Sequence, residues 1–315
     1  MRTRVTFAFF IVSFCVNAAL VEITVVDNHG EPVEDAKSEV AFATYRKNGE
    51  KIVRGLTTKD GKFKARGSSN HSTFVTVEKD GHYRSRIEKL KANTDYDLTV
   101  VLPRIRNPRP LVTNVSTVLQ EFPELPLFDT WIGFDLEKAD WVAPHGKGSV
   151  VDFNIYTSKE FLGFAVTERR MVAIRERYTE FSEDEFRLYW GIWEVSLRLT
   201  FPESRSGIFE SPEYFGYSEM PMPHQAPNTV YRSEWGWDHN RIMISDGRNA
   251  GKGYLMKTRV EIDDEGDEIS ANYSKFLGIP WFDIGGTIRW EYYFNPDPND
   301  RNLEYDGTNL AETQK

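Results

Sequence analysis

Alternation of apolar and polar residues is the dominant pattern in the second part of the chain. At 193–201 the odd positions are apolar and the even positions polar, and 254–262 repeats this pattern. A period of two is that of a β-strand with one buried and one solvent-facing side. The acidic stretch 263–267 turns the chain into 268–276, so these segments predict a hairpin. Further strands are predicted at 287–294, 149–156 and 187–190.

Shorter strand signals fill the first part of the chain and are separated by turn residues. The apolar, β-branched segment 21–26 stops at Asp27-Asn28-His29-Gly30. The segment 53–58 leads into Asp60-Gly61, which predicts a hairpin because glycine adopts positive φ without steric cost. Segments 74–77 and 96–102 supply further strands. Short strands at this spacing predict a small antiparallel β-sandwich.

The first part also resembles a known family. The resemblance rests on residues in matching order and spacing, namely Val26-Asp27, Gly30, Pro32-Val33, Ala36, Thr57-Thr58-Lys59-Asp60-Gly61-Lys62-Phe63, Val75-Thr76-Val77, Lys79, Gly81 and Tyr83. They resemble the carboxypeptidase regulatory-like domain, a transthyretin-like β-sandwich, over about residues 20–103. The resemblance implies a non-catalytic accessory domain of an exported protein. The zinc-ligand motif of the associated peptidases is absent, so it implies no peptidase activity.

Three strings in the second part are similar to exported bacterial proteins that carry the same kind of small sandwich. They are 133–136, 140–148 and 295–306. The similarity implies a shared fold and brings no activity with it.

The N-terminus has the order of a secretory signal. Two arginines precede an apolar run at 5–16, and small residues follow at 18 and 19. The run is shorter than the roughly 20 residues that span a membrane. We therefore expect residues 1–19 to be a signal peptide, and the mature protein to be periplasmic or secreted without membrane insertion. Cleavage there removes Cys15, the only cysteine, which excludes thiol catalysis.

Charge and tryptophan content divide the chain. Residues 20–110 carry a net charge of +4 and residues 111–315 one of −15, and all eight tryptophans lie beyond residue 130. Prolines between the two parts disfavour helix and central strand. We predict a sandwich at 20–105, a proline-bearing linker at 106–126 and an acidic, Trp-rich β domain at 127–315, a larger sandwich or jelly roll. So acidic a domain lacks the basic footprint that nucleic acid requires.

Tryptophans are the candidate ligand-binding residues. Exposed indole rings stack on the apolar faces of sugar rings, so clusters of them are typical of glycan-binding sandwiches. Alternation puts Trp235 and Trp237 on one face, directly before Asp238 and His239, and Trp190 belongs to a second cluster. These five residues form the predicted glycan site. Packing of the tryptophans in the core explains the same pattern.

Acidic loops are the candidate metal sites. Asp297, Asn299 and Asp300 crowd oxygen ligands on a short segment, which suits a weak extracellular calcium site. The hairpin tip 263–268 does so too, although a solvated turn or a structural ion pair explains both segments. The loop histidines His145, His224 and His239 lack metal-ligand spacing. Apart from calcium we expect no cofactor.

The expected protein is all-β, a small transthyretin-like sandwich followed by a larger antiparallel sandwich. No nucleophile-elbow, zinc-protease or phosphate-loop motif occurs in it. The leading hypothesis is an exported, non-catalytic binding or structural protein, with a glycan as the ligand class. The alternative is an extracellular polysaccharide hydrolase that uses paired carboxylates. Its acids would come from Asp135, Asp140, Glu234 and Asp238.

Overall fold

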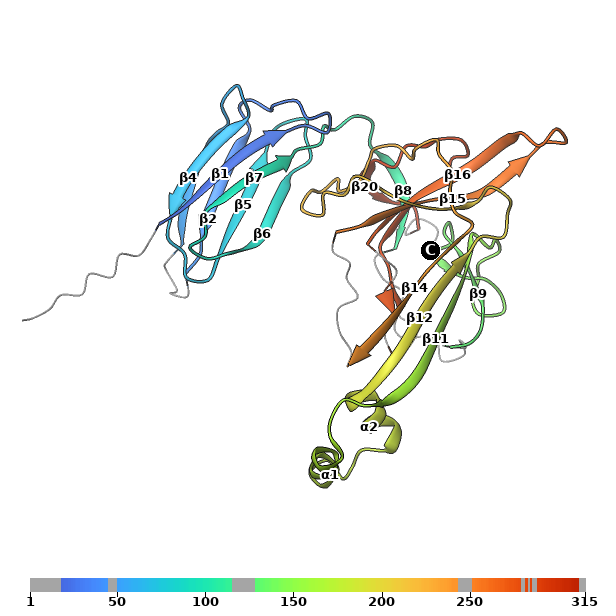
Figure 1. Ribbon diagram of the computed structural model, residues 1–315. Coiled ribbons are helices and arrows are strands. Elements are labelled where there is room, and N and C mark those ends of the chain that lie inside the picture. The colour runs from blue at the N-terminus through green and yellow to red at the C-terminus, as the bar shows by residue number, and fades with distance from the viewer. Residues whose placement is uncertain are drawn as a thin grey trace, which may run out of the picture. The chain divides into compact units, whose positions relative to one another are not determined.

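The computed structural model describes residues 18–44, 50–114, 128–242, 251–278, 281–282, 284 and 288–311, without the side chains of residues 239–242, 281, 282 and 289. The predicted signal peptide lies almost wholly outside the described residues. Strands dominate the described chain and only two short helices accompany them, so the protein is all-β, as predicted (Figure 1). It forms two compact units. One contains the chain up to Ile105 together with Tyr217–Glu219, and the other contains the rest.

The first unit is built from two sheets. Strands β1 (Ala19–Val26), β4 (Lys62–Gly67) and β7 (Tyr96–Val101) form a sheet in the order β4-β1-β7, in which β1 and β7 are parallel. Strands β2 (Lys37–Phe42), β3 (Lys51–Leu56), β5 (Ser72–Glu78) and β6 (Ser85–Lys91) form an antiparallel sheet in the order β3-β2-β5-β6. Alternate residues of both sheets, such as Ile23, Val40 and Val75, share one buried core.

The Asp60-Gly61 turn differs from the prediction. It leads from β3 to β4, and these strands belong to different sheets, so it carries the chain between the sheets and does not close a hairpin. Gly61 has φ +70°, and a Cβ there would lie 2.3 Å from the Val25 carbonyl oxygen. The glycine is therefore needed for the close approach of the turn to β1.

The second unit contains two larger sheets. The five-stranded sheet has the order β10-β9-β11-β12-β14, with β9 (Ile132–Asp135), β10 (Asp140–Trp141), β11 (Phe153–Phe164), β12 (Gly191–Thr200) and β14 (Glu234–Ile242). The six-stranded sheet has the order β13-β15-β16-β19-β8-β20, with β8 (Arg109–Asn114), β13 (Gly207–Glu210), β15 (Gly253–Ile262), β16 (Glu268–Leu277), β19 (Tyr292–Asn295) and β20 (Tyr305–Asn309). β17 (Trp281–Phe282) pairs with β18 (Ile288–Arg289).

One core joins the two larger sheets. Ile155, Leu197 and Leu199 from the five-stranded sheet pack with Met256 and Phe276 from the six-stranded sheet in a single buried cluster. The predicted strand face at 288–294 lies in the same cluster. The other side of the six-stranded sheet is also buried, in a smaller cluster to which the segment 222–231 contributes. The alternation in the sequence thus predicted three of the segments that build this core, at 193–201, 254–262 and 287–294.

Strand β8 corrects the prediction of a linker at 106–126. It lies inside the six-stranded sheet, antiparallel to β19 and parallel to β20. Pro110 is tolerated because the pairs with β19 begin only at Val112, so its missing N–H removes no bond from that ladder. Residues 115–127 of the predicted linker lie outside the described chain.

A helix pair replaces the strand predicted at 187–190. Helices α1 (Glu168–Arg177) and α2 (Glu183–Trp190) lie between β11 and β12 in sequence. The Ser182 hydroxyl accepts a hydrogen bond from the backbone N–H of Glu185, whose carboxylate accepts one from the backbone N–H of Ser182. This capping box starts α2 and favours helix over strand at the following aromatic residues.

Candidate functional site

The register of β14 decides where Trp235 and Trp237 point. Trp235 pairs with Leu199 and Trp237 with Leu197, and both leucines are fully buried. Paired residues of neighbouring strands project to the same side of a sheet. The two tryptophans therefore face the core and lie half-buried at the edge of the sheet, where the Trp235 ring contacts the Tyr254 ring edge-on at 5.1 Å. Their main contribution is to close this edge of the core.

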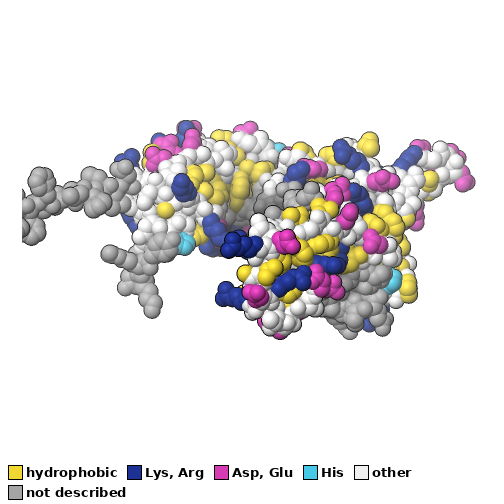
Figure 2. Space-filling model, turned by 60° about the horizontal axis from the view of Figure 1, so that its bottom comes forward, with side chains coloured by type: hydrophobic (Ala, Val, Ile, Leu, Met, Phe, Trp, Pro, Cys, Tyr) yellow, Lys and Arg dark blue, Asp and Glu magenta, His cyan; other side chains and the backbone are white. Residues whose placement is uncertain are grey.

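Trp190 belongs to an aromatic cluster of the helix pair. Its ring centroid lies 5.0 Å from that of Phe186 and 5.5 Å from that of Tyr178, and the residue is half-buried. Val172 and Tyr189 are exposed nearby in sequence. Figure 2 brings this end of the molecule forward and shows side chains of both charges interspersed with hydrophobic ones. The surface here has no single charge sign, and Trp190 packs the helices together.

Asp238 lies on the opposite, solvent-facing side of β14. It is exposed, and its carboxylate accepts a hydrogen bond from Arg198 Nη2 at 2.5 Å. The backbone of His239 pairs with Val195, and its side chain lies outside the described part. Of the five residues in the predicted glycan site, Asp238 alone is placed on the solvent-facing side.

The acidic loop 297–300 forms ion pairs with an arginine of strand β8. The Arg109 guanidinium forms ion pairs with both Asp297 and Asp300, and the Asn299 side-chain amide donates to the Ile269 carbonyl at 3.1 Å. Within the described residues, no group of three or more His, Cys, Asp or Glu side chains is placed to hold a metal ion. The positive charge found at this loop is that of Arg109, and calcium there stays a prediction.

Two of the carboxylates proposed for hydrolysis, Asp135 and Asp140, accept hydrogen bonds from backbone N–H groups. Asp135 is 1% exposed and accepts hydrogen bonds from the N–H groups of Glu137 and Lys138, both at 3.1 Å, and from the segment 149–150. Asp140 accepts from the N–H groups of Trp141 and Lys147. Carboxylates bound in this way organise loops.

Arg259 of β15 forms hydrogen bonds with three acidic residues of the segment 135–152. Its Nε and Nη2 donate to the buried Asp152 at 2.9 and 3.0 Å, Nη2 also donates to Asp135 at 2.9 Å, and Nη1 donates to Glu137. Burial alone would lower the pKa of the guanidinium, but the hydrogen bonds to Asp152 and Glu137 raise it, so the group stays charged. This network is a structural ion cluster in which Asp135 and Asp152 are buried and Arg259 and Glu137 are partly buried.

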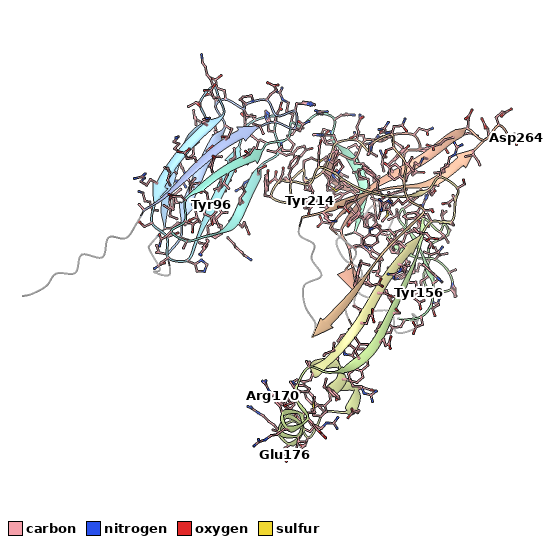
Figure 3. The ribbon with its side chains drawn as sticks, viewed as in Figure 1. Tyr96, Tyr156, Arg170, Glu176, Tyr214 and Asp264 are labelled. Atoms are coloured by element: carbon pink, nitrogen blue, oxygen red, sulfur yellow. The ribbon has the colours of Figure 1, made fainter. Side chains whose placement is uncertain are left out.

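An aromatic pair, one ring exposed and the other half-buried, lies on the solvent-facing side of the five-stranded sheet. Trp131 precedes β9 and is 47% exposed, and its ring centroid lies 5.3 Å from that of Tyr156 on β11. Figure 3 labels Tyr156. The Tyr156 hydroxyl donates to Asp129 at 3.1 Å, and this hydrogen bond to a carboxylate raises the pKa of the phenol. The hydrogen bond fixes the Tyr156 ring, and the exposed Trp131 ring packs beside it.

The aromatic pair begins a row of side chains across the sheet. Tyr156 pairs with Arg198, and Arg198 pairs with Gly236 on β14. Arg198 Nη1 donates to the carbonyls of Leu197 and Trp237 at 3.1 and 2.9 Å. A Cβ on Gly236 would lie 2.5 Å from Arg198 Cδ and from the Leu197 carbonyl oxygen. The glycine therefore lets the arginine lie flat across the edge strand.

A second row continues the polar surface. Ser158 pairs with Ser196, their hydroxyl oxygens are 2.6 Å apart, and Ser196 pairs with Asp238. We call the solvent-facing side of β11, β12 and β14, together with Trp131 and Asp129, the outer face. An aromatic platform beside hydroxyl, guanidinium and carboxylate groups matches what a sugar ring presents, an apolar face and a rim of hydroxyls.

Sequence reasoning missed the aromatic half of the outer face. Alternation at 193–201 already marked Ser196 and Arg198 as solvent-facing. Tyr156 is signalled by its place between buried Ile155 and Thr157, which makes it the solvent-facing residue of a strand. Trp131 has no comparable signal, because it precedes a strand of only four residues.

No protein-family model matches the chain, and no curated protein matches it. Solved structures align with it at low identity. A DUF3823 family protein from Parabacteroides merdae is 9% identical, over 87% of this chain and 96% of that chain, with a TM-score of 0.21. A protein from Bacteroides uniformis, provisionally described as carbohydrate binding, is 10% identical, over 87% and 95% of the two chains, with a TM-score of 0.21.

A streptococcal ancillary pilin is 8% identical, over 74% of this chain and 60% of that chain, with a TM-score of 0.21. The chain thus spans less than two thirds of that pilin. TM-scores of this size do not show a shared overall arrangement, and the all-β class rests on the sheets described above. No helix in the described part of the chain is long and apolar enough to cross a membrane.

Proposed function

We propose that the chain is an exported, non-catalytic binding protein whose outer face binds a glycan. The observation that carries the proposal is the Trp131–Tyr156 pair, an aromatic platform on the solvent-facing side of the five-stranded sheet. An exposed indole offers a flat apolar surface with an N–H at its edge, which suits stacking on the apolar face of a sugar ring. Arg198, the cross-strand partner of Tyr156, is held by Asp238, and the Ser158 and Ser196 hydroxyls add polar groups on the same side of the sheet.

Export is part of the proposal. It is supported by the charged start, apolar run and small residues of segment 1–19. We also propose that the first unit is a carboxypeptidase regulatory-like accessory domain. Its supports are the resembling residues and its three-stranded and four-stranded sheets around one core.

The hydrolase alternative has less support. Asp135 and Asp140 are hydrogen-bonded to backbone N–H groups, and Asp238 is paired with Arg198. A glycosidase needs one acid free to donate a proton and a second as nucleophile or base. Of the four candidate acids, Glu234 alone has neither a backbone N–H group nor an arginine bonded to its carboxylate among the described residues.

A thermal-shift screen of the mature protein against soluble glycans tests the proposal. At least one glycan should raise the melting temperature of the wild type, because a ligand that binds only the folded state stabilises it. The shift should be lost in Trp131→Ala. Tyr189→Ala, which removes an exposed aromatic ring from α2, is the matched control and should keep the shift. A shift that persists in Trp131→Ala would refute the assignment of the site.

A further inference from the structure

The outer face carries more carboxylates than cations. Glu160 on β11 and Glu194 on β12 are direct cross-strand partners, and both are exposed. Asp129 and Glu234 add two further exposed carboxylates. Among the described side chains, none of the four is part of an ion pair. Like charges directly opposite each other destabilise a sheet, so the Glu160–Glu194 pair brings the fold no stability.

The positive charge of Arg198 on the outer face is compensated by the Asp238 carboxylate. Arg198 Nη2 donates to Asp238, and Nη1 donates to the carbonyls of Leu197 and Trp237. Its position over Gly236 is fixed by these bonds. An acidic ligand would therefore meet a guanidinium whose charge is compensated, within a surface of excess negative charge.

We propose that the outer face selects glycans whose sugars carry amino groups over neutral and acidic glycans, an inference that rests on the proposed function. One sugar stacks on Trp131 and Tyr156, and the ammonium group of another lies between Glu160 and Glu194. Four residues of strand separate Tyr156 from Glu160, roughly 13 Å. The ligand is thus an oligomer that follows β11, with the Ser158 and Ser196 hydroxyls facing its middle.

The test is a calorimetric titration of the mature protein with three hexamers, of glucosamine, of N-acetylglucosamine and of galacturonate. The titration is done in mildly acidic buffer, in which sugar amines are protonated. At low salt the glucosamine hexamer should bind about fivefold or more tightly than its N-acetylated counterpart, which carries neutral acetamido groups in place of the ammonium groups. The galacturonate hexamer should bind most weakly. The preference should shrink in high salt because exposed charges are screened.

Two double variants locate the preference. Glu160→Gln with Glu194→Gln should bring the affinities for the two amino-sugar hexamers together. Asp264→Asn with Glu265→Gln removes the same charge from the tip of the β15–β16 hairpin and should leave the preference intact (Figure 3). A preference that survives the first double variant, or that is lost in the second, would overturn the inference.

The outcomes separate the two proposals. If neutral glycans bind through Trp131 as tightly as glucosamine oligomers at low salt, the inference of amine selectivity fails and the glycan site stands. If neither the hexamers nor any glycan of the thermal-shift screen binds, the proposed function fails, and the inference with it.

Discussion

At the scale of single residues, Lys275 occupies an environment that disfavours its charge. It is 2% exposed, on the same side of β16 as Tyr273. Its ammonium contacts the Met220 sulfur at 3.5 Å and lies 4.8 Å from the centre of the Tyr293 ring. Burial lowers the pKa of this lysine to about 7, although Glu304 and Glu291 act in the opposite direction. The folded protein thus favours the uncharged amine.

Replacement of Lys275 by methionine is expected to stabilise the second unit. Between pH 7 and the ordinary lysine pKa of 10.5, the unfolded chain binds the proton that the folded chain has lost. The wild type should therefore gain stability as pH rises through this range, and Lys275→Met should not show this gain. The advantage of the variant is largest near pH 7 and below. Urea unfolding at several pH values measures both effects.

Lys257 supplies the control for this prediction. It lies on β15, but its ammonium is paired with Glu268 at 2.7 Å. Lys257→Met should leave the pH dependence above pH 7 as in the wild type and should not stabilise the protein. If Lys275→Met unfolds at lower urea than the wild type at pH 7, the account of this buried amine is wrong.

Replacement of Arg259 is expected to destabilise the protein, in contrast to replacement of Lys275. Arg259→Leu leaves Asp135 and Asp152 buried without their counter-charge, which costs about 3–5 kcal/mol of unfolding free energy. Lys252→Met, which breaks the exposed pair with Glu210, should cost less than about 1 kcal/mol. Chemical denaturation compares the two. Equal losses would mean that the Arg259 cluster is not the structural tie described above.

Sequence reasoning had no access to this cluster. Arg259 has φ +54° and lies at an irregularity of the β15–β16 pairing, so simple alternation misplaces it. Its partners at 135–152 lie over a hundred positions earlier in the chain. A contact between segments so far apart depends on how the sheets pack, and no local pattern records it.

At the scale of elements, alternation predicted strands well and failed where capping or sheet membership decided the outcome. The predicted strand at 193–201 is confirmed in β12, with Val195, Leu197 and Leu199 buried. The segment 187–190 was wrongly predicted as a strand because the capping box at Ser182 starts a helix. Asp60-Gly61 was correctly predicted as a turn, but its two strands join different sheets.

Replacement of Gly236 tests whether Arg198 lies across strand β14 as described. Gly236→Ala introduces a Cβ that would contact Arg198 Cδ and the backbone carbonyl of Leu197 at 2.5 Å. Either Arg198 leaves its position or β14 moves away from β12, and we expect a loss of about 1–3 kcal/mol. Gly251→Ala, whose Cβ would meet nothing within 4 Å, should have a much smaller effect. Thermal unfolding of both variants tests this, and equal melting temperatures would count against the placement of Arg198.

At the scale of the whole molecule, the chain has two units with separate cores. The first unit's core is drawn from both of its sheets, and the second unit has its own main core. From prolines and a change of charge near residue 110, the sequence predicted a sandwich at 20–105 followed by a linker. In the structure one compact unit comprises the chain up to Ile105 together with Tyr217–Glu219. The adjoining strand β8 was missed, because a proline inside a strand argues against it until the register is known.

The candidate site was only partly predictable. The sequence directed attention to tryptophans, to the second part of the chain and to Asp238. It named the pair Trp235 and Trp237, whose cross-strand partners turn them to the core. The outer face became visible only when the register of β9, β11 and β12 placed Trp131, Tyr156 and Arg198 together.

The central claim is that Trp131, and not Trp235, contacts the glycan. The direct measurement is the dissociation constant of the best glycan from the screen, by calorimetry, for the wild type, Trp131→Ala and Trp235→Phe. Loss of an aromatic platform should weaken binding about tenfold or more in Trp131→Ala, whereas Trp235→Phe should bind as the wild type does. Unchanged affinity in Trp131→Ala, together with a large loss in Trp235→Phe, would contradict the account.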